Sequence, residues 1–280
     1  FSSRRRHTRF RNVTGVQTCA LPIFWTFRYY PSFFGLPIVA DRAILVPTAE
    51  EDAAVKLKVL VDYFDLPRGY IFLTPEEETL VSSSAGHSLQ PSTTIGIGLD
   101  PEAASATMPG GISSPYLLYL GRVDRNKGCD TLLDYFLSYG ESNVTLVLAG
   151  PAKMQIPESP RIRALGYVSD EMRRALLTHA TALVVPSPYE SLSIVLLEGW
   201  NHARPALVNG RCKVLAGQVS RADGGLSYRS AAEFTETLTY LLTHASEREA
   251  FGRQGLAYVD REYRWPTVLA KVEALLSAAT

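Results

Sequence analysis

The sequence predicts an α/β protein made of one complete Rossmann-like domain with a doubly wound parallel sheet, preceded by part of a second Rossmann-like domain. From residue 116 onward, short apolar runs alternate with helical segments at the spacing of such a sheet. A shorter alternation of the same kind occupies residues 24–100. Residues 101–115 are rich in Ala, Ser, Gly and Pro and mark the linker between the two domains.

The first 23 residues differ from the rest, because they contain five arginines, no acidic residue and no helical or strand period. Arg-rich, acid-poor starts are typical of transit peptides, but these are also amphipathic. The string instead resembles translated sequencing-adapter sequence. We therefore expect residues 1–23 to be non-native and the reading frame to be truncated at its 5′ end.

The smaller unit should contain three strands and two helices. A proline at the first helical position and acidic residues in the first turn favour helix starts at residues 75 and 50. In chain order we expect a strand at 42–49, a helix at 50–64, a strand at 70–74, a helix at 75–84 and a strand at 93–101.

The larger unit, residues 116–265, should contain five parallel strands with helices between them. The strands are expected at 116–120, 144–149, 162–165, 182–185 and 205–208. Two further helices should begin near Ser230 and Ser246, and a terminal helix at 266–280 begins with Pro266, which suits a first helical turn.

Two glutamates, Glu190 and Glu198, lie eight residues apart where the apolar run 181–186 ends and an apolar helix begins. Ser191 or Ser193 is a suitable N-cap, and the N–H groups of a helix N-terminus favour a diphosphate. If the stretch is helical, eight positions span roughly 12 Å with a rotation of about 80°, which places both carboxylates on one side. Such pairs often form only a solvated face, but the residues between these two are too apolar for that. One carboxylate could hold a sugar hydroxyl and the other a ribose.

Two cations, Arg122 and Lys127, follow the predicted strand at 116–120. Loops at the carboxyl ends of strands in an open α/β sheet are the usual ligand position, and cations there would neutralise a diphosphate leaving group. Taken alone, these residues would equally fit an ordinary surface loop.

Five segments together resemble the retaining, GT-B-fold glycosyltransferases of the glycosyltransferase-4 group, in the order that the family has them, over about the last two thirds of the chain. They are residues 121–128, 146–151, 164–200, 204–210 and 224–228. The resemblance implies that residues 116–265 form the donor-binding domain, and that the terminal helix packs back toward the first domain.

By this resemblance Arg122 and Lys127 hold the donor diphosphate and Glu190 the transferred sugar, and these three are the catalytic candidates. Ser191 and Leu192 stand where the family more often has glycine and an aromatic residue, which leaves backbone N–H donation but puts the sugar contacts in doubt. The nucleotide-binding candidates comprise Gly121, Gly150, Tyr167, Val168, Ser191, Leu192, Ser193 and Glu198, with Glu198 on the ribose and the backbone of Tyr167 and Val168 against the base.

The implied activity is hexosyl transfer, with retention of configuration, from a UDP- or GDP-linked sugar to a glycan, lipid or small-molecule acceptor, without metal or cofactor. Since the acceptor pocket and the family's active-site histidine would lie in the missing part of the first domain, we expect the truncated chain itself to be inactive. A nucleotide-sugar-binding fragment and a GT-B-fold sugar-nucleotide epimerase are the alternatives. His87, His179 and His202 are expected to be structural.

Composition excludes several other classes. Equal numbers of basic and acidic residues, 28 each, give no attraction to nucleic acid. Gly121 and Gly128 are too few and too far apart for a nicotinamide-binding fingerprint. Cys19, Cys129 and Cys212 have no disulfide or zinc spacing. No apolar run reaches the length of a membrane span. We expect a cytoplasmic protein whose membrane contact, through the missing half, would be peripheral on the inner face.

Overall fold

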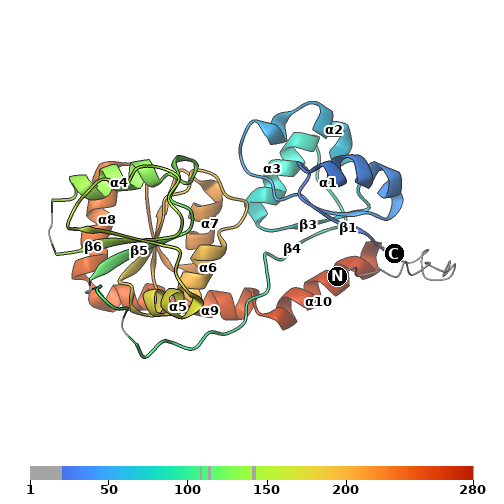
Figure 1. Ribbon diagram of the computed structural model, residues 1–280. Coiled ribbons are helices and arrows are strands. Elements are labelled where there is room, and N and C mark those ends of the chain that lie inside the picture. The colour runs from blue at the N-terminus through green and yellow to red at the C-terminus, as the bar shows by residue number, and fades with distance from the viewer. Residues whose placement is uncertain (1–20, 108, 113–114, 141–142, 280) are drawn as a thin grey trace, which may run out of the picture.

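Two parallel sheets form two lobes (Figure 1) in a computed structural model that describes residues 21–107, 109–112, 115–140 and 143–279. The smaller sheet has the strand order β1-β2-β3-β4, and the larger has β10-β9-β8-β5-β6-β7. Every neighbouring pair of strands is parallel. This confirms the predicted α/β class. Residues 1–20 of the expected non-native segment, including Cys19, lie outside the described residues.

The smaller lobe begins at Ile23, which pairs with Ile44, one residue before the boundary drawn from the sequence. Its strands are β1 (Ile23–Trp25), β2 (Ile44–Val46), β3 (Gly69–Phe72) and β4 (Ser92–Thr94). Its helices are α1 (Tyr30–Gly35), α2 (Val59–Phe64) and α3 (Pro75–Ala85), with 3₁₀ turns η1 (Leu36–Arg42) and η2 (Ala54–Lys56).

The predicted helix at 50–64 is wrong, since the chain forms η2 and α2 separated by Leu57 in an extended conformation. Val55 and Phe64 are both buried in the core of this lobe. In one continuous helix they would lie about 180° apart and could not both face that core. The break at Leu57 allows each of the two short pieces to bury its own apolar residue.

The predicted strand at 93–101 is also shorter than expected, because β4 ends at Thr94. Beyond it the chain leaves the sheet and runs beside the end of α9. The Leu99 N–H donates to the Tyr263 carbonyl over 2.7 Å, and Leu99 forms a parallel bridge with Arg264. The junction between the lobes thus takes the backbone bonds that the sheet would have used.

The larger lobe contains the five predicted strands, each within one residue of its expected bounds, and a sixth, β10, that the sequence analysis had not assigned. The strands are β5 (Tyr116–Leu120), β6 (Thr145–Ala149), β7 (Ile162–Gly166), β8 (Ala182–Val185), β9 (Ala206–Asn209) and β10 (Gly225–Tyr228). The helices are α4 (Cys129–Ser138), α5 (Asp170–His179), α6 (Ile194–Asn201), α7 (Lys213–Ala222), α8 (Ala231–Thr243), α9 (Ala245–Glu262) and α10 (Trp265–Ala279), with the 3₁₀ turn η3 (Arg125–Lys127).

Both faces of the larger sheet are covered, as a doubly wound fold requires. Along β5, Leu117 and Tyr119 belong to one buried cluster, whereas Leu118 and Leu120 belong to another. The first cluster is completed by residues of α4 and α8, and the second by residues of α5, α6, α7 and α9. Cys129 and Cys212 are free, buried thiols within these clusters, as predicted.

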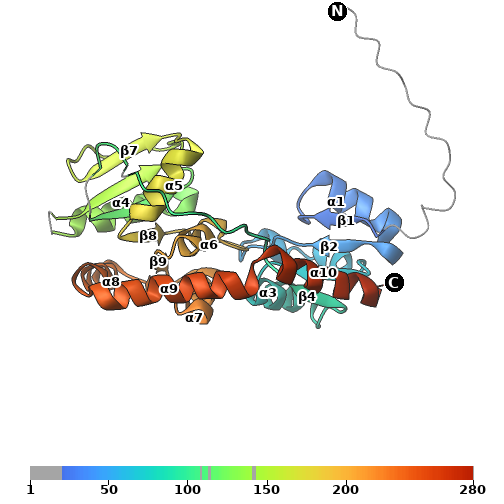
Figure 2. The same ribbon diagram turned by 90° about the horizontal axis from the view of Figure 1, so that it is seen from below.

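The terminal helix crosses back to the smaller lobe. Figure 2 shows α9 and α10 running one after the other along the same side of both lobes, and α10 contacts β3 and β4. The Arg68 guanidinium donates to the Ala279 carbonyl over 3.0 Å. No described helix is both long and apolar enough to cross a membrane.

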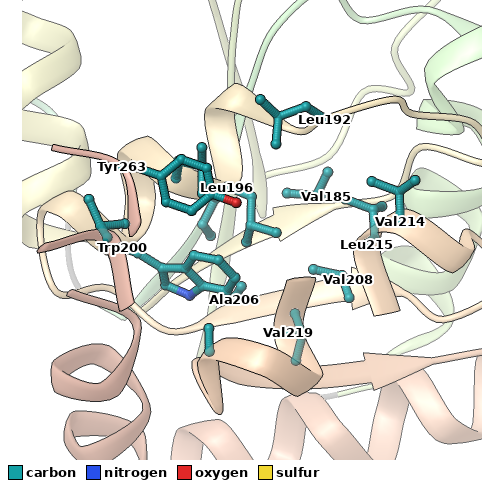
Figure 3. Packing of buried hydrophobic residues seen from close by; sticks show 14 of the residues in the cluster. Val185, Leu192, Leu196, Trp200, Ala206, Val208, Val214, Leu215, Val219 and Tyr263 are labelled. Carbon is teal, nitrogen blue, oxygen red and sulfur yellow. The ribbon is translucent and has the colours of Figure 1, made fainter. Parts of the chain in front are cut away.

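Trp200 occupies the centre of the core beneath α6 and α9 (Figure 3), where its side chain is fully buried. Its indole N–H donates to the Gly224 carbonyl over 2.8 Å, and its ring meets Tyr258 edge-on at 5.9 Å. Trp200 therefore joins α6, α9 and the start of β10 through one side chain.

Replacing Trp200 by alanine should lower the free energy of unfolding by about 3–5 kcal/mol, because it leaves a cavity and a carbonyl without its donor. Urea denaturation followed by circular dichroism measures this loss. Trp25 is the matched control, since 55% of its surface is exposed. Its replacement by alanine should cost much less, and equal losses would contradict the assignment of Trp200 as a core residue.

Candidate functional site

The carboxyl ends of the central strands of the larger sheet face the smaller lobe. A cleft of about 710 Å³ lies between the lobes there. Its walls come from residues 49–61 and α3 on one side, and from residues 188–190 and 211–214 on the other. Of the predicted catalytic residues, Glu190 lines this cleft.

Lys127 and Glu190 meet although they are 63 residues apart in sequence, with Lys127 Nζ 2.9 Å from Glu190 Oε1. They follow β5 and β8, which pair directly. Gly128 makes the approach possible, because it has φ +72° and a Cβ there would lie 2.4 Å from the Pro186 carbonyl oxygen. The two strand-end loops are thereby held against each other, with the ion pair at their contact.

Arg122, the second predicted cation, pairs with Asp124 at 2.9 Å and keeps about half of its side chain exposed. Asp124 also caps η3 by accepting from the Asn126 N–H at 2.9 Å. Each of the two predicted phosphate-binding cations therefore already has a carboxylate partner, and these four charges sum to zero. A diphosphate would have to share Lys127 and Arg122 with Glu190 and Asp124.

The apolar helix that follows Glu190 begins at Ile194, because its N-cap Ser193 is extended. Residues 190–193 are thus not helical, and the expectation that one continuous helix aligns Glu190 with Glu198 does not hold. Ser193 Oγ accepts from the Leu196 N–H, while the Ser193 N–H donates to Gln218 Oε1 at 3.3 Å. Gln218 is fully buried on α7, and no sequence pattern had pointed to it.

Glu198 lies on α6 with 20% of its side chain exposed, and it pairs with Arg173 of α5 rather than with a residue near Glu190. Burial raises the pKa of the Glu198 carboxyl, and the charge of Arg173 acts in the opposite direction. The two predicted carboxylates therefore have different cationic partners in different loops and helices.

The remaining predicted residues line adjacent strand ends. The Gly121 N–H donates to the Ala149 carbonyl, and the Gly150 N–H donates to the Gly166 carbonyl, so the turns after β5, β6 and β7 are joined in series. Beyond β7, 87% of Tyr167 is exposed, whereas Val168 packs against the core. Leu192 is buried in the core beneath the loop.

The smaller lobe reaches this site through three contacts that sequence analysis missed. The Thr74 hydroxyl donates to the Ser191 carbonyl at 3.1 Å. Arg221 of α7 binds both carboxylate oxygens of Glu76, and Lys213 lies 2.7 Å from Glu51. The acidic starts of the segments at 50 and 75 were the signal, but the sequence offered only helix capping as their role.

Glu50 belongs to the same surroundings, although it was expected to begin a helix. Burial raises the pKa of its carboxyl, the charges of Lys127 and Arg28 lower it, and Glu190 raises it again. Glu50 therefore shares the field of the Lys127–Glu190 pair from the other lobe.

Glu77 is a buried carboxylate that shapes the cleft wall of the smaller lobe. Its Oε1 accepts from the Ala49 N–H and its Oε2 from the Leu73 N–H, both at 2.6 Å. Burial raises the pKa of Glu77 to about 7, against the lowering effect of these bonds. The side chain ties the loop after β2 to the loop after β3.

Because the unfolded chain releases this proton near pH 4.5 and the folded chain near pH 7, the fold should lose stability as pH rises across that interval. The contribution is about 3 kcal/mol, constant above pH 7. Urea denaturation at several pH values measures it.

Replacing Glu77 by glutamine should remove this component from the pH dependence, so the difference between the two proteins isolates it. The amide would also face one backbone N–H with its own NH₂ group and cost about 1–3 kcal/mol at all pH values. Parallel pH curves for the two proteins would contradict this account.

Comparison with known proteins adds two findings. Residues 114–244, a little under half of the chain, match the family described as Glycosyl transferases group 1. No curated protein sequence is significantly similar to the chain. Many solved structures have a similar arrangement of both lobes. The chain has the GT-B fold.

Sucrose-phosphate synthase from Thermosynechococcus elongatus is 18% identical, with a TM-score of 0.73 over 92% of this chain and 74% of that one. HepE of Anabaena, in complex with UDP, is 13% identical, with a TM-score of 0.75 over 92% and 79%. TarM of S. aureus is 13% identical, with a TM-score of 0.68 over 84% and 51%. At these identities the likeness establishes the fold alone, and the chain spans between about half and four fifths of these proteins. Together with the family match, it supports a glycosyltransferase.

Proposed function

We propose that this chain is a glycosyltransferase that takes a sugar from a nucleoside diphosphate sugar and transfers it to an acceptor in the cleft between the lobes. The observation that carries the proposal is the Lys127–Glu190 pair, which lies where two central strands end and Glu190 faces the cleft. Cleft-facing strand ends are where open α/β sheets bind their ligands.

In this proposal Glu190 accepts a hydroxyl of the transferred sugar, and Lys127 and Arg122 stabilise the departing diphosphate. The N-terminus of α6 adds the backbone N–H groups of Ser191 and Leu192, which donate no hydrogen bond within the described part of the chain. Preorganised donors and cations of this kind stabilise charge that develops on a leaving group. Retention of configuration and the lack of a metal requirement are part of the same proposal.

The nucleoside would lie along the neighbouring strand ends. Gly121 and Gly150 allow close approach of the phosphates, the backbone at Tyr167 and Val168 contacts the base, and Glu198 binds the ribose hydroxyls. Solved structures of Anabaena HepE with UDP and with UDP-glucose support a UDP-linked hexose as the first donor to test. A GDP-linked sugar is the second. The acceptor, a glycan, lipid or small molecule, would bind against the smaller lobe.

Replacing Lys127 by alanine should weaken UDP binding by roughly tenfold or more, because it removes a charge-assisted contact to the diphosphate. Isothermal titration of UDP measures the change. Lys153 is the matched control, since it is an exposed lysine in the loop after β6. Equal effects of the two substitutions would count against the diphosphate site.

Replacing Glu198 by alanine should reduce the affinity for UDP by roughly tenfold or more while leaving affinity for inorganic pyrophosphate unchanged, because the lost acceptor serves the ribose. Titrations of both ligands, with circular dichroism to verify folding, make the comparison. An equal loss for pyrophosphate would place Glu198 elsewhere, and folded protein that binds neither UDP nor GDP would contradict the proposed function. Donor consumption without an acceptor would favour an epimerase.

A further inference from the structure

The ion pair of Glu198 is held within a larger charged group at the back of the proposed nucleotide site. Arg173 of α5 contacts Glu198 Oε1 through one guanidinium nitrogen, and 26% of the arginine side chain is exposed. Among the described residues, Arg173 is the sole cation within ion-pair distance of Glu198. The second carboxylate oxygen has no protein donor in that part of the chain.

The linker between the lobes supplies the other side of this group. Glu102 Oε1 lies 3.9 Å from the Arg173 guanidinium, and Glu102 Oε2 lies 3.8 Å from Arg174 and 3.2 Å from the His202 ring. Burial lowers the pKa of His202, although Glu102 acts against this. Arg173 therefore lies between two carboxylates, one on α6 and one on the linker.

Further hydrogen bonds fix the linker to the larger lobe at this point. The Asn201 side-chain amide donates to the Asp100 carbonyl at 2.9 Å, and the Ser105 N–H donates to Thr178 Oγ1 at 3.0 Å. Glu102 thus approaches Arg173 from a backbone that is anchored on both sides.

We propose that Arg173 is the positioning residue for Glu198, and that Glu102 of the linker restrains Arg173 in that task. The inference rests on the proposed function, because it assigns Glu198 to the ribose hydroxyls. Arg173 occupies one oxygen of Glu198 and leaves the other to accept hydroxyl protons from the ribose. Arg173 itself does not touch the nucleotide.

Physical chemistry favours an arginine in this position. A partly buried carboxylate tends toward its neutral form, which accepts hydroxyl protons less well. The guanidinium stays protonated at all relevant pH values, and its planar shape fixes the carboxylate rotamer. A second carboxylate on its far side orients the guanidinium, so a hydroxyl-binding group is preformed before the nucleotide arrives.

The test is titration of UDP into the full chain between pH 5 and 8. Arg173→Met should weaken UDP binding by roughly tenfold at neutral pH. It should also move the pH at which affinity is lost upward, because Glu198 without its cation takes up a proton more readily as pH falls. The charged groups that face Glu198 are Arg173 and, more distantly, Glu102. The UDP phosphate titrates in every variant alike, so the difference between variants reports Glu198.

Arg174→Met is the matched control, since this arginine is adjacent on the same helix and faces Glu102 but not Glu198. It should leave both the affinity and the pH profile unchanged. Arg173→Lys should restore the pH profile and part of the affinity, because it keeps the charge without the planar contact. Glu102→Gln should cause a smaller loss than Arg173→Met.

A merely structural role for Arg173 would lower thermal stability and weaken binding equally at every pH, and that result would overturn the inference. So would an unchanged affinity in Arg173→Met while the unaltered chain binds UDP. Arg173→Gln replaces the methionine variant if the latter does not fold. Failure of the unaltered chain to bind UDP or GDP would instead refute the proposed function, and the inference with it.

Discussion

The pairing of β5 with β8 is the constraint on which the rest of the site depends. Leu117 and Leu118 lie opposite Ala182 and Leu183, so two loops distant in sequence leave the sheet side by side. A sheet that inserted another strand between these two would separate Lys127 from Glu190 by at least one strand spacing, about 4.8 Å. The order of the strands, more than any single side chain, therefore creates the ion pair. Gly128 then allows the loops to touch.

The contact between the lobes is polar and concentrated near this pair. Thr74 binds the backbone of the loop that carries Ser191, while Glu76 and Glu51 meet cations at the start and end of α7. The smaller lobe thus contacts the loop at the N-terminus of α6 directly. Buried Glu77 connects the two strand-end loops from which these contacts come, and its burial carries a desolvation cost. The position of the cleft wall is worth that cost to the structure.

Charge balance is a second property of the site. Lys127, Arg122 and Arg173 each have a carboxylate partner within the protein. Such pairing keeps partly buried charges from being isolated, which would be far more costly than the pairs themselves. It also means that an anionic ligand would compete with protein carboxylates and gain less than it would from free cations. Binding at such a site depends on geometry more than on net charge.

The sequence by itself determined the strands of the larger sheet and most of its helices, because short apolar runs and serine N-caps act locally. Ser169 and Ser230 accept from the N–H three residues ahead, as N-cap serines do. It also placed Lys127 and Glu190 in strand-end loops. The parallel α/β pattern carries that information, since ligand loops follow strands.

Tertiary structure alone decided which charges meet. Arg173 is 25 residues from Glu198, and Gln218 is 25 residues from Ser193, and no local period relates either pair. The same holds for the broken helix at 50–64, whose composition favours one helix while the positions of Val55 and Phe64 in the core require two pieces. Local preferences set the elements, but burial and ion pairing depend on which elements become neighbours, and that follows from strand order.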